Sequence, residues 1–374
     1  MTRPGRRARA MAAAGGAAWA ATLVADRRRV RADPMRERLA RRVEGRPVHV
    51  RAGDGTDLRV RVLGRDDAPT VVLVHGWTCA LEFWTLQLQA LAGRLRLVAY
   101  DLRGHGGSAP SSGGDYSIEA YRDDLEAVLR ATVPSGQRPV LVGHSLGAMT
   151  IVAWAAERRE RGEDVGARIA AAGLFNTGVG DLISSSLVLP ARGLGERIEQ
   201  ELGQLVLGSR MPIPSRTTPV SARVVRYVAL SPSASPATVA FCERMVLACP
   251  RDVRANTGST LSRLDLQAGL EALDVPTLVL SGRADRLTPP VHAERMAERL
   301  PRLLGHVEVP DVGHMAPVEA PARVTAAIER LVAAAGYSPS PGRGAMSGAA
   351  PASSMTRTGS SAGSVDRLSA TLTG

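Results

Sequence analysis

Short apolar runs alternate with longer amphipathic stretches through the middle of this chain of 374 residues. Six runs contain valine, leucine, isoleucine or alanine with few polar interruptions, and glycine or proline bounds most of them. Such runs are typical of parallel strands that are buried on both faces. The six runs are residues 70–76, 95–101, 139–145, 169–176, 276–282 and 305–310.

Two earlier segments have a different pattern, in which apolar residues alternate with arginine. They are residues 48–52 and 58–64, and Asp54-Gly55 lies in the short stretch between them. Alternation predicts strands with one face toward solvent, and an Asp-Gly pair is a common hairpin turn. We therefore expect an antiparallel hairpin at the edge of the sheet.

The stretches between the runs predict helices at residues 117–133, 146–161, 292–300 and 316–335. Alternating strands and helices favour a doubly wound, mostly parallel α/β sheet with right-handed crossovers. The six runs and the two hairpin strands together predict an eight-stranded sheet.

The alternation of strands and helices stops near residue 177 and resumes near residue 275. The interval is too long for a loop and must carry structure of its own. Its leucine, valine, proline and arginine content indicates a mainly helical insertion. An insertion after the carboxyl end of a strand lies over the ligand crevice of such a sheet. We therefore interpret residues 178–274 as a cap within a domain that spans residues 47–336.

The N-terminal arm, residues 1–46, holds 13 arginines and four acidic residues around an alanine-rich segment, Ala10 to Ala25. Sixteen helical residues span about 24 Å, less than the roughly 30 Å hydrocarbon core of a bilayer. Three interpretations stay open: a short anchor or membrane-surface helix, a frayed arm, and a cleaved signal peptide. The first two predict a membrane-associated or cytoplasmic protein, and the third predicts export.

The C-terminal segment, residues 337–374, is rich in serine, glycine, alanine, proline and threonine. Few large apolar residues interrupt it, so it cannot bury enough surface to offset the entropy cost of ordering. We expect this segment to be disordered.

The net charge of +11 raises the question of a nucleic-acid partner. All 47 basic residues are arginine, because the chain has no lysine. Residues 47–336 hold 31 arginines and 31 acidic residues, so the domain itself is neutral. The domain has no net positive charge with which to bind phosphate groups, and we expect no nucleic-acid partner. The three cysteines have no metal-ligand spacing with histidine, so we expect no metal site.

A G-x-S-x-G motif, Gly143-His144-Ser145-Leu146-Gly147, follows a predicted strand and opens a predicted helix. The same pattern recurs at residues 359–363 in the tail, so the context must distinguish the two. A sharp strand-to-helix turn at Ser145 needs small residues at Gly143 and Gly147. It would present the hydroxyl above the sheet at a helix N-terminus, which predicts a nucleophilic serine.

A serine nucleophile needs a base, and the base needs an acceptor that fixes its tautomer. His314 follows the last predicted strand, and Asp285 follows the strand before it. The carboxyl ends of parallel strands meet at one edge of a sheet. We therefore predict Ser145 as the nucleophile, His314 as the base and Asp285 as the acid, with Asp181 or Asp311 as alternative acids.

The segment His75-Gly76-Trp77 ends the first predicted parallel strand. Acyl transfer needs two backbone N–H groups directed at the developing oxyanion. The N–H groups of Leu146 and Trp77 are the candidates, and Gly76 permits the tight turn that the second one needs. We expect His75 and His144 to support these turns by packing or hydrogen bonding.

Taken together, these motifs resemble the α/β-hydrolase superfamily, in the branch with an HG-x oxyanion loop and a helical cap. The matching segments are residues 73–77, 101–108, 142–148, 281–289 and 312–317. The resemblance implies, position by position, the nucleophile Ser145, the acid Asp285, the base His314, and the oxyanion donors Trp77 and Leu146. Epoxide hydrolases and haloalkane dehalogenases of this superfamily have aspartate where this chain has Ser145, which argues against their chemistry.

The resemblance implies a serine hydrolase that acts on a small or medium, largely uncharged ester-like acyl substrate without a metal or organic cofactor. The same triad serves perhydrolases and carbon–carbon bond hydrolases, so these activities stay open. A ligand-binding protein that keeps the fold without turnover is the alternative from a different class.

Overall fold

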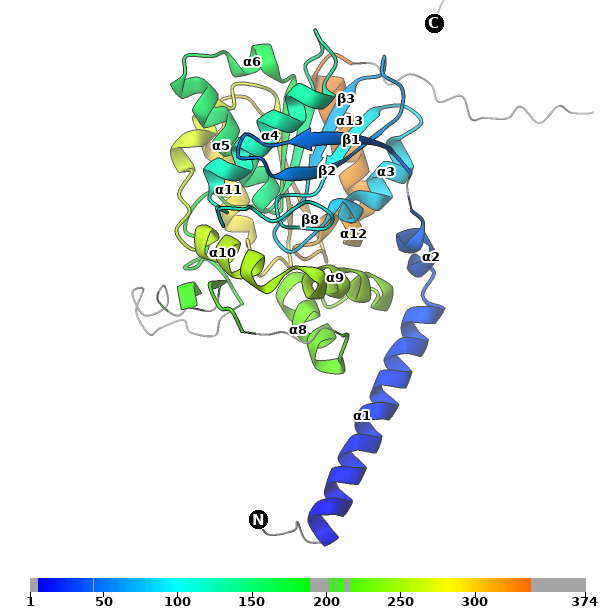
Figure 1. Cartoon of the computed structure of the whole chain (residues 1–374). Helices are drawn as coiled ribbons and strands as arrows, with labels where there is room; N and C mark the ends of the chain where they lie inside the picture. Colours follow the sequence, from blue (N-terminus) through cyan, green and yellow to red (C-terminus); the bar gives the residue numbers. More distant parts are fainter. Residues whose placement is uncertain are drawn as a thin grey trace, which may run out of the picture. The chain divides into compact units, whose positions relative to one another are not determined.

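The computed structural model describes residues 6–42, 44–188, 201, 203–205, 207–211 and 216–337. An eight-stranded sheet lies at its centre, in the order β1-β2-β4-β3-β5-β6-β7-β8 (Figure 1). The strands are β1 (Arg46–Arg51), β2 (Asp57–Leu63), β3 (Thr70–Val74), β4 (Arg96–Tyr100), β5 (Val140–His144), β6 (Ala171–Phe175), β7 (Thr277–Gly282) and β8 (Leu303–Val309).

The strand directions agree with the sequence pattern. The strands β1 and β2 form an antiparallel hairpin at one edge, and β2 is also antiparallel to β4. All other neighbouring strands are parallel. The predicted fold class and the edge hairpin are therefore confirmed.

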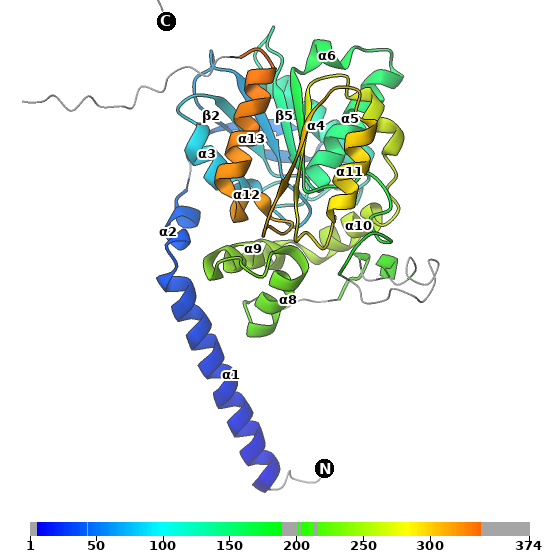
Figure 2. The same cartoon turned by 180° about the vertical axis from the view of Figure 1, so that it is seen from behind.

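Successive residues of the central strands point into two separate apolar cores. In β3, Val72 and Val74 belong to one core, and Val71 and Leu73 belong to the other. This two-sided burial explains why these strands read as unbroken apolar runs. The first core includes residues of α4 (Ile118–Thr132), α5 (Leu146–Glu160) and α11 (Pro290–Arg299), and the second includes those of α3 (Thr85–Leu91) and α13 (Pro321–Ala334). Figure 2 shows α13 on the side of the sheet opposite to α4.

The helix that we expected over residues 316–335 is divided into two. A short helix, α12 (Ala316–Glu319), ends before Ala320, and α13 begins at Pro321. Proline cannot donate the backbone hydrogen bond that would continue the helix, and its ring disfavours a helical conformation at the preceding residue. The expectation of a single helix was therefore wrong at this point.

Helices follow strand β6 in the segment that we interpreted as the cap. They are α8 (Pro219–Ala229), α9 (Pro236–Ala248), α10 (Arg251–Leu261) and the 3-10 helix η2 (Gln267–Ala272). Thr218 and Ser235 cap the first two, and proline occupies the first turn of each, as is common at helix starts. Residues 189–200, 202, 206 and 212–215 of the cap lie outside the described residues.

The N-terminal arm contains α1 (Arg6–Ala32) and α2 (Met35–Ala40). The turn between these two helices is hydrogen-bonded to the cap, because the Asp33 carboxylate accepts from the N–H of Ala237, 2.8 Å away, at the start of α9. Within the described ranges, no helix has both the length and the apolar character needed to cross a bilayer. Of the tail that we expected to be disordered, residues 337–374, only Tyr337 is described, and its hydroxyl donates to the Arg138 carbonyl, 2.8 Å away. Residues 338–374, with the second G-x-S-x-G pattern, lie outside the described residues.

Candidate active site

The backbone makes a strained turn at Ser145, between β5 and α5. Its φ of 52° and ψ of −120° lie in a region that residues with a side chain rarely adopt. The Ser145 N–H donates to the carbonyl of Phe175, 3.0 Å away, which fastens the turn to the neighbouring strand β6. The side chain is mostly buried, with 8% of the residue exposed.

Three glycines let the backbone close around this turn. A methyl group at Gly143 would overlap the backbone of Ala148, and one at Gly147 would overlap the Val74 carbonyl. A Cβ at Gly76 would lie 2.7 Å from His144 Nδ1 and 3.0 Å from Ser145 Cβ. The loop after β3 therefore passes directly beside the serine.

His314 and Asp285 form a buried pair on the loops after β8 and β7. The His314 Nδ1–H donates to Asp285 Oδ2, 2.8 Å away. The other carboxylate oxygen accepts from the N–H groups of Leu287 and Thr288, each at 2.9 Å. These bonds fix the carboxylate and leave the Nε2 atom of the imidazole as its proton-accepting position.

Two further residues hold the Asp285 carboxylate, and the sequence patterns did not reveal them. Asn176 Nδ2 donates to Asp285 Oδ2 (3.1 Å) and to the Gly313 carbonyl (3.0 Å), and Thr288 Oγ1 donates to the same Oδ2 (3.0 Å). Burial raises the pKa of Asp285, but the charge and hydrogen bond of His314, with the bonds from Thr288 and Asn176, outweigh it and keep the pKa below its usual value. The carboxylate is therefore ionised at neutral pH.

His144 connects the serine turn to the histidine loop. Its Nε2–H donates to the His314 carbonyl (2.8 Å), and the two imidazole rings lie 4.9 Å apart between centroids. Burial lowers the pKa of His144 to about 3, so this ring is neutral. In the described part of the chain, Ser145 Oγ makes no direct hydrogen bond to the imidazole of His314. Such catalytic hydrogen bonds often tighten only in the complex with substrate.

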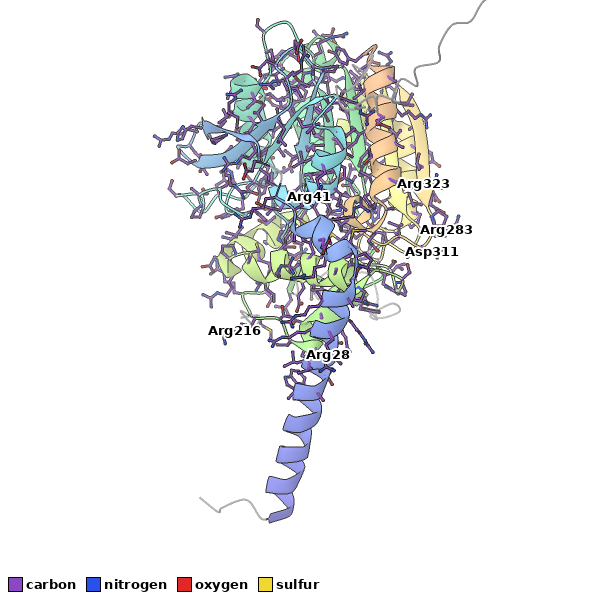
Figure 3. The ribbon with its side chains drawn as sticks, turned by 90° about the vertical axis from the view of Figure 1, so that its right-hand side faces the viewer. Arg28, Arg41, Arg216, Arg283, Asp311 and Arg323 are labelled. Atoms are coloured by element: carbon purple, nitrogen blue, oxygen red, sulfur yellow. The ribbon has the colours of Figure 1, made fainter. Side chains whose placement is uncertain are left out.

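The two alternative acids lie away from the imidazole. Asp181 is exposed and pairs with Arg295 Nη1, 3.6 Å away. Asp311 is also exposed, and Figure 3 places it at the edge of the molecule near Arg283. The geometry therefore favours Asp285 as the partner of His314.

The loop with the first expected oxyanion donor, Trp77, is held by His75. His75 Nε2 accepts from the N–H of Leu102 (3.0 Å), so its Nδ1–H donates to the Gly76 carbonyl (2.8 Å). Burial lowers the pKa of this ring to about 4, which keeps it neutral.

The second expected donor, Leu146, is the first residue of α5, where a backbone N–H has no partner inside the helix. Trp77 follows Gly76 directly and packs against the cap, where a Cβ at Gly258 would meet its ring at 3.1 Å.

The loop of residues 101–108 holds His75 through the N–H of Leu102 and is itself fixed by hydrogen bonds. Asp101 accepts from the N–H of Leu81 (2.6 Å) and of Gly107 (2.8 Å). Arg103 binds both oxygens of Asp124, at 2.7 and 2.6 Å. Hydrogen bonds of its own side chains therefore fix this loop.

Glu319 ties the His314 loop to the cap, and its role was not predicted. Its carboxylate accepts from the N–H groups of Gly313 (3.2 Å) and Met315 (3.1 Å), on either side of the histidine. It also accepts from the N–H of Ser231 in the cap, 2.8 Å away. The glutamate therefore fixes both the position of the imidazole loop and its distance from the cap.

Chemically, the site joins a strained serine, an imidazole with a fixed tautomer and a buried carboxylate at one edge of the sheet. Throughout the described ranges, no cluster of three or more histidine, cysteine or acidic residues could hold a metal ion. All three cysteines are buried as free thiols. The arrangement suits proton transfer from a hydroxyl nucleophile without any further group.

The sequence and the fold are both similar to those of known proteins. A sequence model described as the alpha/beta hydrolase family matches residues 71–327. A thermophilic esterase from Thermogutta terrifontis has a similar structure, with a TM-score of 0.62 and 27% identity, covering 78% of this chain and 99% of that protein.

Two curated relatives match shorter stretches. A bifunctional esterase/perhydrolase of Acinetobacter calcoaceticus is 37% identical over 100 residues, 26% of this chain and 35% of that protein. The Mycobacterium tuberculosis protein named "Probable oxidoreductase EphD" is 35% identical over 112 residues, 30% of this chain and 18% of that protein. The chain therefore spans about a third or less of the length of these relatives.

Proposed function

Because the chain belongs to the alpha/beta hydrolase family, we propose that it is a serine hydrolase that cleaves an ester-like acyl substrate through an acyl-enzyme intermediate. The observation that carries this proposal is the buried hydrogen bond of 2.8 Å between His314 Nδ1 and Asp285, on the loops beside the strained turn at Ser145. It leaves His314 Nε2 as the group that accepts a proton.

The reaction begins when Ser145 Oγ attacks the carbonyl carbon of the substrate and His314 Nε2 takes the hydroxyl proton. Asp285 stabilises the resulting imidazolium and holds its orientation. The N–H groups of Trp77 and Leu146 donate to the tetrahedral oxyanion. His314 then protonates the leaving alcohol, and the acyl group stays on Ser145.

A water molecule releases the acid in the second half of the reaction. His314 removes a proton from the water, which attacks the acyl carbon, and the imidazolium returns that proton to Ser145 Oγ. Each step uses only side chains and backbone groups of this chain, so the proposal requires no metal or organic cofactor.

A fluorophosphonate probe tests the proposal directly, because it phosphonylates an activated serine. We expect labelling of the purified protein, no labelling of Ser145→Ala, and unchanged labelling of Ser111→Ala, which alters a buried serine of another loop. Labelling that persists in Ser145→Ala would show that a different serine is the nucleophile. Retention of a chromogenic ester without any turnover would instead favour the ligand-binding alternative.

Perhydrolysis is a second candidate activity, supported by the similarity to the bifunctional esterase/perhydrolase. In that reaction hydrogen peroxide replaces water in the attack on the acyl-enzyme, so the product is a peracid. Assays of one ester with and without peroxide measure the ratio of the two products. A series of chromogenic esters of increasing acyl length defines the substrate range in the same experiment.

The N-terminal arm gives the chain a further expected property, attachment to anionic membrane surfaces through residues 1–46. The arm holds nine more positive than negative charges, and each such charge near an anionic surface contributes about 1 kcal/mol. The triple variant Arg27→Glu, Arg28→Glu and Arg29→Glu should reduce sedimentation with anionic vesicles. Equal sedimentation of this variant and the natural chain would show that these arginines of the arm do not attach the protein to the membrane.

A further inference from the structure

Helix α8 of the cap exposes a row of apolar side chains. Val220, Val224 and Tyr227 are 55%, 53% and 51% exposed. Their spacing of four and three residues puts them on one face of the helix. The other side of α8 packs into the protein through Val225 and Ala229. We call the three exposed residues the apolar stripe.

Other exposed large apolar residues gather in the same parts of the chain. Leu187, Leu205 and Met211 belong to the cap, and Trp19 and Val24 belong to α1. Among the residues that the structure describes, the sole large apolar residue exposed elsewhere is Leu303. Contiguous exposed apolar groups, such as the apolar stripe, are a feature of interaction surfaces, whereas single scattered ones need no explanation.

Figures 1 and 2 both place α8 at the end of the cap that faces away from the sheet, next to α1. The apolar stripe therefore lies on an exposed surface of the cap.

Arginines surround a groove of about 1040 Å³ between α1 and the helices α8 and α9. The groove is lined by Arg27, Arg29, Arg31, Arg36, Arg216, Arg223, Arg226 and Arg244. Of the described residues, two acidic ones, Asp26 and Glu243, line it with them. Figure 3 shows Arg28 and Arg216 at the same end of the molecule. We call this region the basic groove, and its charge suits an anionic partner.

Arginines also lie directly beside the apolar stripe, one of them outside the basic groove. The guanidinium carbon of Arg286 lies 4.8 Å from the centre of the Tyr227 ring. Arg223, between the two valines in sequence, is exposed and lies 3.9 Å from Asp26 of α1. Amphipathic helices that lie on membranes combine these features, with apolar side chains beside arginines and a tyrosine at the level of the headgroups.

We propose that the cap docks on an anionic phospholipid bilayer, with the apolar stripe at the acyl boundary and the arginines of the basic groove on lipid phosphates. A nucleic acid would use the arginines but would leave the valines in water. A neutral apolar partner would bury the valines and leave the arginines without counter-charges. A bilayer with anionic headgroups satisfies both groups at once. The apolar stripe lies outside residues 1–46, whereas four of the eight arginines of the basic groove belong to that arm. The inference therefore extends the proposed membrane attachment of the arm to the cap, and it does not depend on the proposed catalytic chemistry.

Cosedimentation of the full chain with vesicles tests the proposal. We expect binding to vesicles of phosphatidylcholine with one third phosphatidylglycerol, and much weaker binding to phosphatidylcholine alone. Replacing both valines by serine, Val220→Ser with Val224→Ser, should weaken binding to the anionic vesicles about tenfold, since it removes apolar area that the bilayer would bury. The matched control Leu303→Ser removes an exposed leucine at the amino end of β8 and should leave binding unchanged.

Charge reversal separates the basic groove from the apolar stripe. Arg223→Glu with Arg226→Glu should weaken binding to anionic vesicles and reduce its dependence on salt, whereas Arg302→Glu, an exposed arginine next to Leu303, should not. Unchanged binding of the valine variant, or equal binding to both kinds of vesicle, would overturn the proposal.

The oligomeric state provides an independent check. Light scattering that shows a dimer of the natural chain and a monomer of the valine variant would assign the apolar stripe to a second copy, which also overturns the proposal. A monomer in both cases supports it. Thermal unfolding of each variant confirms that the loss of binding is not a loss of folding.

Discussion

The backbone N–H of His314 donates a hydrogen bond to the carbonyl of Ala229, 3.0 Å away, at the last residue of helix α8. The loop with the expected base is thus bonded to the cap as well as to its own strand. Gly313 lies so close to Leu230 and Ser231 that a Cβ there would be 2.5 Å from the Ser231 nitrogen. The cap therefore contributes to the position of the imidazole.

Glu319→Gln should impair turnover more than substrate binding. The amide keeps one accepting oxygen, but its NH2 group then faces backbone N–H donors that the carboxylate satisfied. Leaving such donors unpaired costs about 1–3 kcal/mol. We expect kcat to fall at least tenfold with little change in KM, and a lower urea midpoint. Glu329→Gln, which alters a surface partner of Arg94, should leave kcat and the urea midpoint unchanged. A fall in stability without any effect on kcat would limit Glu319 to a structural role.

Asp285→Asn should reduce kcat by about 10⁴, as expected for a triad whose histidine takes the wrong tautomer. The N–H groups of Leu287 and Thr288 would hold the amide oxygen, so the NH2 group would face His314 Nδ1. Nδ1 would then accept, and Nε2 would carry the proton and could no longer take one from Ser145. Steady-state kinetics measures the effect. Asp181→Asn and Asp311→Asn are the controls, and a comparable loss in either would reassign the acid.

Gly147→Ala should destabilise the protein, because the new methyl group would overlap the Val74 carbonyl. Overpacking of this kind costs about 1–3 kcal/mol, and here the neighbour is backbone that cannot rotate away. Gly113→Ala is the matched control, since a Cβ there meets no atom within 4 Å. Chemical unfolding compares the two variants. Equal stability of both would mean that the serine turn tolerates more space than the contacts indicate.

The stability of the fold should fall as the pH falls below about 6.5. Burial lowers the pKa of His75 to about 4 and the pKa values of His105 and His144 to about 3, from 6.5 in the unfolded chain. Below pH 6.5 the unfolded chain therefore binds protons that the folded chain does not. Each histidine should contribute a loss of about 1.4 kcal/mol between pH 7.5 and pH 5.5.

Urea unfolding at these two pH values measures the loss. His105→Asn should reduce the difference by the share of one histidine, because His105 is buried and its ring titrates only on unfolding. His49→Asn, which changes an exposed ring, provides the comparison. The interpretation fails if His105→Asn leaves the pH dependence as steep as in the natural chain.

The sheet and the order of its chemical groups could be predicted because each depends on local sequence. Short apolar runs rich in valine, leucine and alanine mark most of the strands, and Ser145, Asp285 and His314 each follow a predicted strand. In a parallel sheet the carboxyl ends of the strands lie at one edge, so residues that follow different strands come close together. Thus the positions of the candidate triad followed from the pattern before any contact was known.

The supporting residues could not be predicted, because their roles depend on contacts between distant loops. Asn176 reaches Asp285 across 109 residues, and Glu319 reaches Ser231 across 88. One local signal did exist for Asn176, since an asparagine that ends an apolar run often takes a positive φ, and its φ is 45°. The capping and packing of the cap helices likewise depend on neighbours that a linear pattern does not identify.

The close approach of Gly282 and Gly313 has a practical consequence for engineering. A side chain at Gly282 would overlap the carbonyls of Val312 and Gly313, so the turns after β7 and β8 fit together without spare room. Mutant libraries that vary these turns would yield mostly unfolded or inactive clones. Diversity aimed at new substrates belongs instead on the crevice-facing side of the cap helices, where side chains can change size while the backbone of the two turns stays as it is.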